Sequence, residues 1–173
     1  MADQLLFPDA AQRIMSLIRT TYGDTFKAYF LGVPDDFLIP EAGYPACIVQ
    51  KTVGTFKVGP TTADDITEQV YIHLIVNNKT GFGAPDSDYT IMRQLQTFVE
   101  GRDPTNGYLL PNTLMFALRT NLTLKTTIAP GLVTINNDVH INYDVAERKN
   151  MPTTTEAVID VTVTERQIVL NRR

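Results

Sequence analysis

Two histidines, His73 and His140, are the side chains in this 173-residue chain best suited to acid–base or metal chemistry. Each lies in a stretch with strand-like alternation, and His140 stands near Asp138 and Asp144. The spacings His-x-His and His-x3-His, which would bring two ligands onto one metal, are absent. The sequence therefore favours two partly exposed strand histidines. The alternative is a small enzyme whose site uses both histidines and the nearby acids.

The other groups with chemical potential also have plainer interpretations. The single cysteine, Cys47, excludes an internal disulfide, and its apolar surroundings "PACIVQ" predict a buried, unreactive thiol. The stretch "GFGAPDSD" lacks the Lys-Ser/Thr pair of a phosphate loop and the pattern of a dinucleotide-binding turn. It indicates a loop that leads into a capped helix, and Ser87 has no nucleophile-elbow context.

Paired acids occur twice, at Asp35–Asp36 and at Asp64–Asp65. Adjacent carboxylates point in different directions, and both pairs stand in turn-like segments, so turn formation explains them. The alternating ligands of a calcium loop are absent. We therefore expect no catalytic residues, no cofactor and no metal site.

The composition is that of one globular domain spanning residues 1–173. The chain has 15 basic and 19 acidic residues, hence a net charge of −4, with 43% hydrophobic and 20% charged residues. A general nucleic-acid binder would usually be basic. The first residues show no signal-peptide pattern, and no apolar run approaches the roughly 20 residues of a membrane span. We expect a protein of the cytoplasm, or of something assembled there.

Apolar spacing predicts two long helices and a short one. The first follows Pro8 and Asp9, repeats apolar residues at helical spacing and ends at Gly23. The second begins with Asp88 as its N-cap and ends before Gly101. The segment "NTLMFALRT" predicts the short helix.

Period-2 alternation predicts five or six strands. The candidate segments are residues 26–31, which have the weakest pattern, 46–53, 65–77 and 121–128, the two arms of a hairpin within 132–146 that turns at 136–138, and a strand near the C-terminus. Residues 54–65 are rich in turn formers. This inventory predicts an α+β fold: a largely antiparallel or mixed β-sheet, covered on one face by two α-helices, with long protruding strands or a protruding hairpin.

The last strand is longer than a compact domain needs. In "TTTEAVIDVTVTERQIVL" apolar and polar residues alternate, and fifteen residues of strand would reach roughly 50 Å. A compact domain of this length has a diameter of about 40 Å. We expect the surplus to contact copies of the chain or stacked neighbours.

Semi-apolar loops support that expectation, because large apolar loops tend to mark interfaces. The segments "GTFKVGPTTADD", "LLPNTLMF" and "RQIVLNRR" carry apolar residues where a monomer would be polar. The alternatives are that these segments fold back on their own core, or that an exposed sheet edge recruits a single partner. The candidate interface residues are Phe56, Val58, Phe82, Asn136, Asn137, Ile168 and Leu170.

The order and texture of the elements resemble a known family. A first helix is followed by "YPACIVQ", "TEQVYIHLIV", the helix "APDSDYTIMRQLQTFVEG", "PNTLMFALRT", a sheet hairpin and "TEAVIDVTVTER". From about Ala10 to Val169 this resembles the tail terminator (tail completion) proteins of long-tailed bacteriophages. Other phage neck proteins, such as head-closure stoppers and adaptors, look similar. The Pro-rich segment 33–45 has no counterpart in the family's pattern.

The resemblance implies a non-enzymatic virion protein, assembled in the host cytoplasm into a hexameric ring. The ring would end tail-tube polymerisation, with the tail-tube protein on one face and the head-completion or connector protein on the other. Loops 54–65 and 78–87 and the tip at 136–138 would meet these partners. DNA would pass through the channel without specific binding, along an acidic lining that includes Asp64, Asp65 or Glu68.

Overall fold

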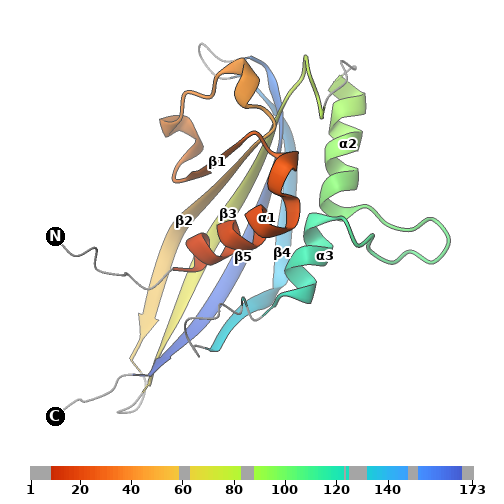
Figure 1. Ribbon diagram of the computed structural model, residues 1–173. Helices are drawn as coiled ribbons and strands as arrows, with labels where there is room; N and C mark the ends of the chain where they lie inside the picture. The colour runs from red at the N-terminus through yellow and green to blue at the C-terminus, as the bar shows by residue number, and fades with distance from the viewer. Residues whose placement is uncertain are drawn as a thin grey trace.

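A computed structural model describes residues 9–58, 63–82, 88–122, 124, 132–147 and 152–168 of the chain. Within them lie one five-stranded sheet and three α-helices, which confirms the predicted α+β fold (Figure 1). Long strands extend past the helices toward one end of the molecule, as expected for protruding strands. No helix in the described part of the chain is long and apolar enough to cross a membrane.

The strand order in the sheet is β1-β2-β3-β5-β4. The short β1 (Ala28–Leu31) runs parallel to β2 (Ala46–Lys57), and every other pairing is antiparallel. The remaining strands, β3 (Ala63–Asn77), β4 (Leu132–Ala146) and β5 (Thr154–Ile168), have 15 residues each. The strand near the C-terminus is thus as long as predicted, and it lies inside the sheet between β3 and β4.

The helices begin and end near the predicted signals. In α1 (Ala10–Tyr22), Asp9 is the N-cap, with its carboxylate accepting from the Gln12 backbone N–H at 2.9 Å, and Gly23 is the C-cap. The helix α2 (Asp88–Glu100) includes Asp88 as its first residue, one position later than the N-cap role predicted for it. The short α3 (Leu114–Thr120) is capped by Thr113.

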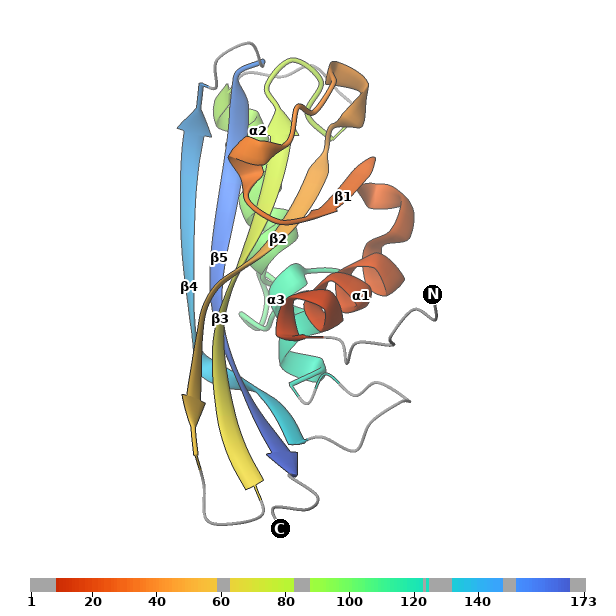
Figure 2. The ribbon, with the colours of Figure 1, turned by 90° about the vertical axis from the view of Figure 1, so that its left-hand side faces the viewer.

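All three helices pack on one face of the sheet and enclose the main core, which buries the apolar face predicted for β3 (Figure 2). On the opposite face, residues 34–45 build a smaller cluster around Ile48 and Ile75. The rings of Phe30 and Phe37 stack there at 4.6 Å. The Pro-rich segment is therefore a packed cover for one end of the second face.

The hairpin predicted within 132–146 is wrong. Residues Leu132–Ala146 form one continuous strand, β4, whose pairing with β5 shifts between Ile135 and Val139. Over that step β5 advances only from Val163 to Val161, so the extra β4 residues form a bulge. Asn136 and its neighbours fit a bulge as well as a turn, and the pairing on both sides favours the bulge.

Two further expectations need comment. One segment expected to be a turn-rich loop is mostly strand, and one predicted strand lies mostly outside the described residues. Residues 54–65 were expected to be turn-rich, yet β2 continues to Lys57 and β3 begins at Ala63. Thr55, Phe56 and Lys57 pair with Thr67, Ile66 and Asp65, so cross-strand pairing overrides the local turn formers. The strand predicted at 121–128 lies mostly outside the described residues.

Candidate interaction surface

The second half of β2 is a strand without a cover. Residues 46–49 are buried, whereas every residue from 51 to 58 is exposed. The ribbon shows this half of β2 running past the helices toward one end of the molecule (Figures 1 and 2). We call residues 51–58 the bare segment. Three of its large apolar side chains are open to solvent: Val53 is 53% exposed, and Phe56 and Val58 are each 68% exposed. An apolar group of this kind on a projecting strand is typical of a protein contact.

Both edges of the sheet lack a strand partner along much of their length in the described part of the chain. The parallel strand β1 covers β2 only as far as the Leu31–Val49 pair, which leaves the outer edge of the bare segment open. At the other side β4 is the outermost strand. Its Ile135 N–H donates to the Leu122 carbonyl at 2.8 Å, and past this point the edge is unpaired. Unpaired edges are templates for a further strand.

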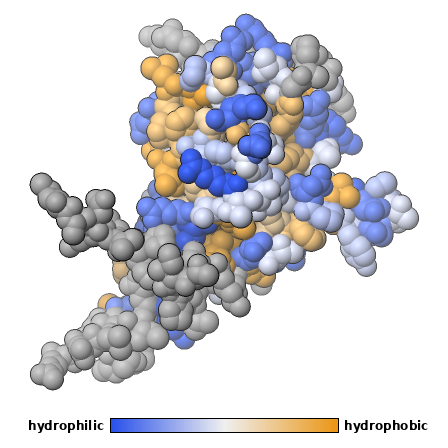
Figure 3. Space-filling view, viewed as in Figure 1, coloured by the Kyte–Doolittle hydropathy of each residue, from blue (hydrophilic) through white to orange (hydrophobic). Residues whose placement is uncertain are grey.

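A second group of apolar side chains lies on the β2 side of the molecule. Leu31, Val33 and Leu38 are 47%, 41% and 81% exposed, and they stand on β1 and the turns that follow it. In the space-filling view apolar surface gathers over this part of the chain, at the upper left (Figure 3). The β2 side therefore offers apolar contacts both beside β1 and along the bare segment.

The other predicted interface residues occupy varied places. Phe82 is half-buried, with its ring centroid 5.7 Å from that of Phe98 against the main core, so its ring packs inside the monomer. Asn136 lies in the β4 bulge, where its side-chain oxygen accepts from the Thr164 hydroxyl at 3.2 Å. Asn137 is also in β4, Ile168 pairs with Ala63 at the end of β5, and Leu170 lies outside the described residues.

The predicted channel acids differ in accessibility. Asp65 is bound by Arg166, with N–O distances of 2.8 and 3.2 Å, and this hydrogen bonding lowers the pKa of the carboxyl. Asp64, its neighbour in β3, is half-buried. Glu68 is only 6% exposed, so it does not fit the role of a channel-lining acid.

Glu68 instead joins the first helix to the sheet. Its carboxylate accepts from the Ala10 backbone N–H at 2.9 Å and pairs with the Lys51 ammonium. Nearby, the buried Arg13 guanidinium lies 3.5 Å from the Glu165 carboxylate of β5. The α1 N-terminus is thus held to β3 and β5 by charged groups where the bare segment begins.

The two histidines lie on the face of the sheet that the helices leave open. His73 is opposite Val158 and His140 is opposite Asp160, so β5 separates the two side chains. With strands about 4.8 Å apart and about 3.4 Å per residue, their Cα atoms are about 12 Å apart. Asp160 accepts instead from the Gln69 amide at 2.9 Å.

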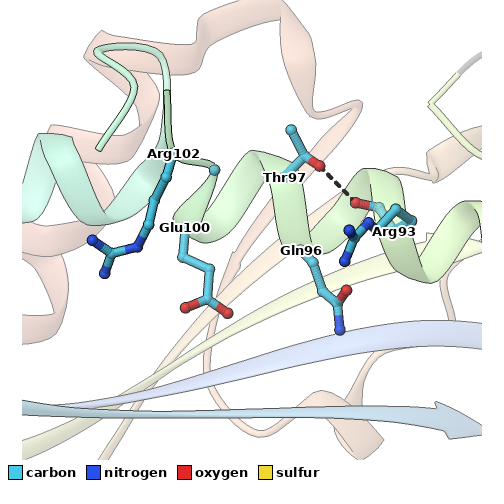
Figure 4. A pocket seen from close by; sticks show the side chains of 6 residues that line it. Arg93, Gln96, Thr97, Glu100 and Arg102 are labelled. Carbon is cyan, nitrogen blue, oxygen red and sulfur yellow. Dashed lines mark hydrogen bonds between the residues drawn. The ribbon is translucent and has the colours of Figure 1, made fainter. Parts of the chain in front are cut away.

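A depression of about 510 Å³ lies along α2, lined by Arg93, Gln96, Thr97, Glu100, Gly101 and Arg102 (Figure 4). Glu100 accepts a hydrogen bond from the Tyr143 hydroxyl of β4 at 2.8 Å. Burial and this carboxylate raise the pKa of Tyr143. The depression lacks a nucleophile paired with a base among its lining residues, so it offers a polar surface beside the β4 edge.

A smaller apolar hollow of about 40 Å³ lies between α3 and the β4 edge. Leu118 and Leu122 line it from the helix side, and Ile135 and Val139 line it from the strand. Among the described residues, no three His, Cys, Asp or Glu side chains gather closely enough to hold a metal ion. What the described surface offers is free edges, exposed apolar groups and shallow hollows.

The sequence predicted Phe56 and Val58 as surface apolar residues, and missed Val53 and the role of Glu68. Period-2 alternation held a signal for Glu68, because it shares the apolar face of β3 with Ile66 and Val70. Comparisons with known proteins add no family: no family model matches the chain, and no curated protein matches it.

Proposed function

We propose that this chain is a non-enzymatic structural protein of a virion. It forms a ring at the head-proximal end of a phage tail, ends tail-tube polymerisation and joins the tail to the head. The resemblance in element order suggests this role, and one observation supports it best. The sheet carries an exposed segment with Val53, Phe56 and Val58, and among the described residues both of its edges run without a strand partner over much of their length.

Such a surface suits repeated contacts better than a reaction. In a closed ring each copy uses one edge toward each neighbour, and cyclic symmetry multiplies a weak contact. The hexameric number comes from the resemblance. The tail-tube protein and the head-completion or connector protein are the proposed axial partners, and DNA passes through the channel without specific binding.

Two of the three acidic residues predicted to line the channel remain candidates. Asp64 and Asp65 lie at the start of β3 and are not buried, whereas Glu68 is bound to α1. Acidic side chains would let DNA slide because they make no attractive contacts with phosphates. Replacing both aspartates with asparagine should leave ring assembly intact and slow DNA passage; unchanged ejection kinetics would remove them from the lining.

The direct test measures mass in solution and images the particles by negative stain, with and without added tail-tube protein. We expect rings with a central hole, formed by the chain alone or on contact with the tube. Binding to the connector alone, with no effect on tube length, would favour another neck protein. A chain that stays monomeric with both partners, and loses an enzymatic activity on His73→Ala or His140→Ala, would overturn the proposal.

A further inference from the structure

The two sheet edges that are free among the described residues are complementary in direction. β2 and β5 both run antiparallel to β3, and β4 runs antiparallel to β5, so β4 runs antiparallel to β2. Rotation about a ring axis preserves the sense of each strand relative to that axis. The β4 edge of one copy can therefore meet the β2 edge of the next as an antiparallel pair, which is β-augmentation between copies.

The free parts of the two edges are offset along the sheet. On β2 the open part is the bare segment, which faces residues 65–70 of β3, while on β4 it begins at the bulge and runs to Ala146. A joint between them must therefore be staggered. Closed barrels require such a stagger, because their strands tilt by about 35–45° to the axis.

The faces on which the side chains lie determine which register of the β2–β4 joint is favourable. Phe56 is opposite Ile66, whose side chain is buried on the helix side, and Val139 packs against the core on that same side. Placing Phe56 opposite Val139 brings the exposed ring to the apolar hollow beside α3. The same register puts Thr55 opposite His140 on the open face and Lys57 beside Asp138. Apolar and charged groups both find partners in it.

The charges of the two edges are opposite in sign. The bare segment carries Lys51 and Lys57 and no acid, whereas β4 carries Asp138 and Asp144 and neither lysine nor arginine. Opposite charges across an interface fix register and disfavour wrong pairings. A β2 edge meeting another β2 edge would place lysines together, so this pattern favours the unlike pair.

The proposed register also determines the tilt of the strands to the ring axis, and this tilt falls in the range of closed β-barrels. Phe56 shares a row with Ile66 and Glu165, whereas Val139 shares a row with Val161, a step of 165 minus 161, or four residues, along β5. That step is about 14 Å, and one copy contributes four strand spacings, or about 19 Å, around the ring. The ratio corresponds to strands tilted by about 35°, which is the tilt of closed barrels.

We propose that copies of this chain join edge to edge, the bare segment of β2 pairing antiparallel with β4 of the next copy, with Phe56 opposite Val139 and Lys57 beside Asp138. The joint makes one continuous sheet whose open face, with Asp65, Tyr71 and Asp160, lines the inside and whose helices lie outside. Asp64 shares the helix side with Ile66, so in this arrangement Asp65 is the lining acid of that pair. This inference rests on the part of the proposed function in which the chain assembles with itself.

Engineered cysteines test the register. Thr55 and His140 are both exposed on the open face, and Cys47 is buried with 0% exposure, so it contributes no background. Under mild oxidation the variant with Thr55→Cys and His140→Cys should give a ladder of disulfide-linked chains, alone or with tail-tube protein. The matched control combines Thr55→Cys with Asp144→Cys, which is about 14 Å out of register, and it should give none.

Charge reversal gives an independent test. Lys57→Glu should weaken self-association at least about tenfold, since it places two acids together, and adding Asp138→Lys should restore it. Lys79→Glu, in an exposed turn, is the control and should leave association unchanged.

The outcomes separate the two proposals. Rings that form without the expected disulfides, or with disulfides only in the control pair, overturn the edge joint and leave the proposed function standing. Disulfide ladders that form while no ring assembles on tail-tube protein support the joint and count against the proposed function. A chain that gives no ladder and no association in either condition overturns the joint.

Discussion

The two halves of β2 show what this fold does with one strand. Ala46, Cys47, Ile48 and Val49 are between 0% and 1% exposed, while farther along Val53 and Phe56 are 53% and 68% exposed. Both halves pair with β3 in a regular antiparallel register apart from one bulge. Pairing and β-propensity are therefore enough to form the strand, and its burial depends on what packs against it.

Charged side chains lie at the boundary between the two halves of β2. Lys51, the first residue of the bare segment, pairs with Glu68, and Glu68 also accepts from the N-terminus of α1. The helix ends its cover at this point. Beyond this point the strand still pairs with β3, but its side chains are exposed and available to a partner. The covered half therefore contributes to the stability of the fold, and the exposed half to recognition.

The largest expected contrast is in thiol reactivity along β2. Burial raises the pKa of Cys47 to about 12, so almost none of it is thiolate at neutral pH. A thiol at Thr55→Cys, in the Cys47→Ser background, would be exposed. We expect it to react with a disulfide reagent at least about a thousandfold faster than native Cys47.

Stopped-flow labelling of the folded variants measures both rates, and labelling in denaturant provides the control. Both thiols should react at similar rates once the chain is unfolded. Fast labelling of Cys47 in the native protein would mean that the covered half opens readily, and the contrast between the halves would fail.

The second contrast is in stability. Ile72 is 0% exposed in the main core, and Ile72→Ala should lower the free energy of unfolding by about 2–5 kcal/mol, through lost burial and the cavity left behind. Val53→Ala removes an exposed side chain and should cost less than about 0.5 kcal/mol in the monomer. Urea unfolding at low protein concentration compares the two. A similar loss in both variants would show that the bare segment packs inside the monomer.

The buried part of the sheet was predictable from the sequence, but the distance to which its strands extend was not. Alternation of Val70, Ile72 and Leu74 with more polar residues fixed the buried face of β3, because a period of 2 places such residues on one side. The end of β2 lay among glycines and threonines, where local signals favour a turn. Pairing with β3 keeps these residues extended, and such a long-range contact has no local signature.

The third contrast concerns the boundary itself. Glu68→Ala would leave the buried Ala10 N–H without its acceptor and Lys51 without its carboxylate, and we expect a loss of about 1–3 kcal/mol. Thr67→Ala, the adjacent residue on the open face, is the matched control and should cost little. The denaturation midpoint reports the loss at unchanged m-value, and faster amide exchange at the start of α1 locates it. Equal midpoints for the two variants would exclude the anchoring role of Glu68.

The interaction surface was also only partly predictable, because local sequence signals reveal some of its residues and long-range contacts determine the others. Phe56 and Val58 stood out because apolar residues between glycines rarely serve a core. Glu68 was misjudged because an acid in a strand is usually solvated. Alternation places it on the apolar face of β3, and the contact with α1 shows how its carboxylate is used there. The free edges themselves depend on strand order, which alternation does not encode.

The smallest contrast lies at the far end of the sheet, where Asp65 and Arg166 pair in solvent. The hydrogen bond from Arg166 lowers the pKa of Asp65 in the folded chain below its unfolded value. The pair therefore contributes stability above the unfolded pKa, near 4, and that contribution is lost as pH falls through the lower folded pKa. A carboxyl-detected NMR titration should show that the pKa of Asp65 is lower in the wild type than in Arg166→Gln, where it returns toward its ordinary value. Arg119→Gln, at an exposed position of α3, should not change the pKa of Asp65, and added salt should shrink the difference because Asp65 and Arg166 are both exposed. An Asp65 that titrates identically in the wild type and in Arg166→Gln would mean that the ion pair does not persist in solution, and that the end of the sheet is held by its backbone pairing alone.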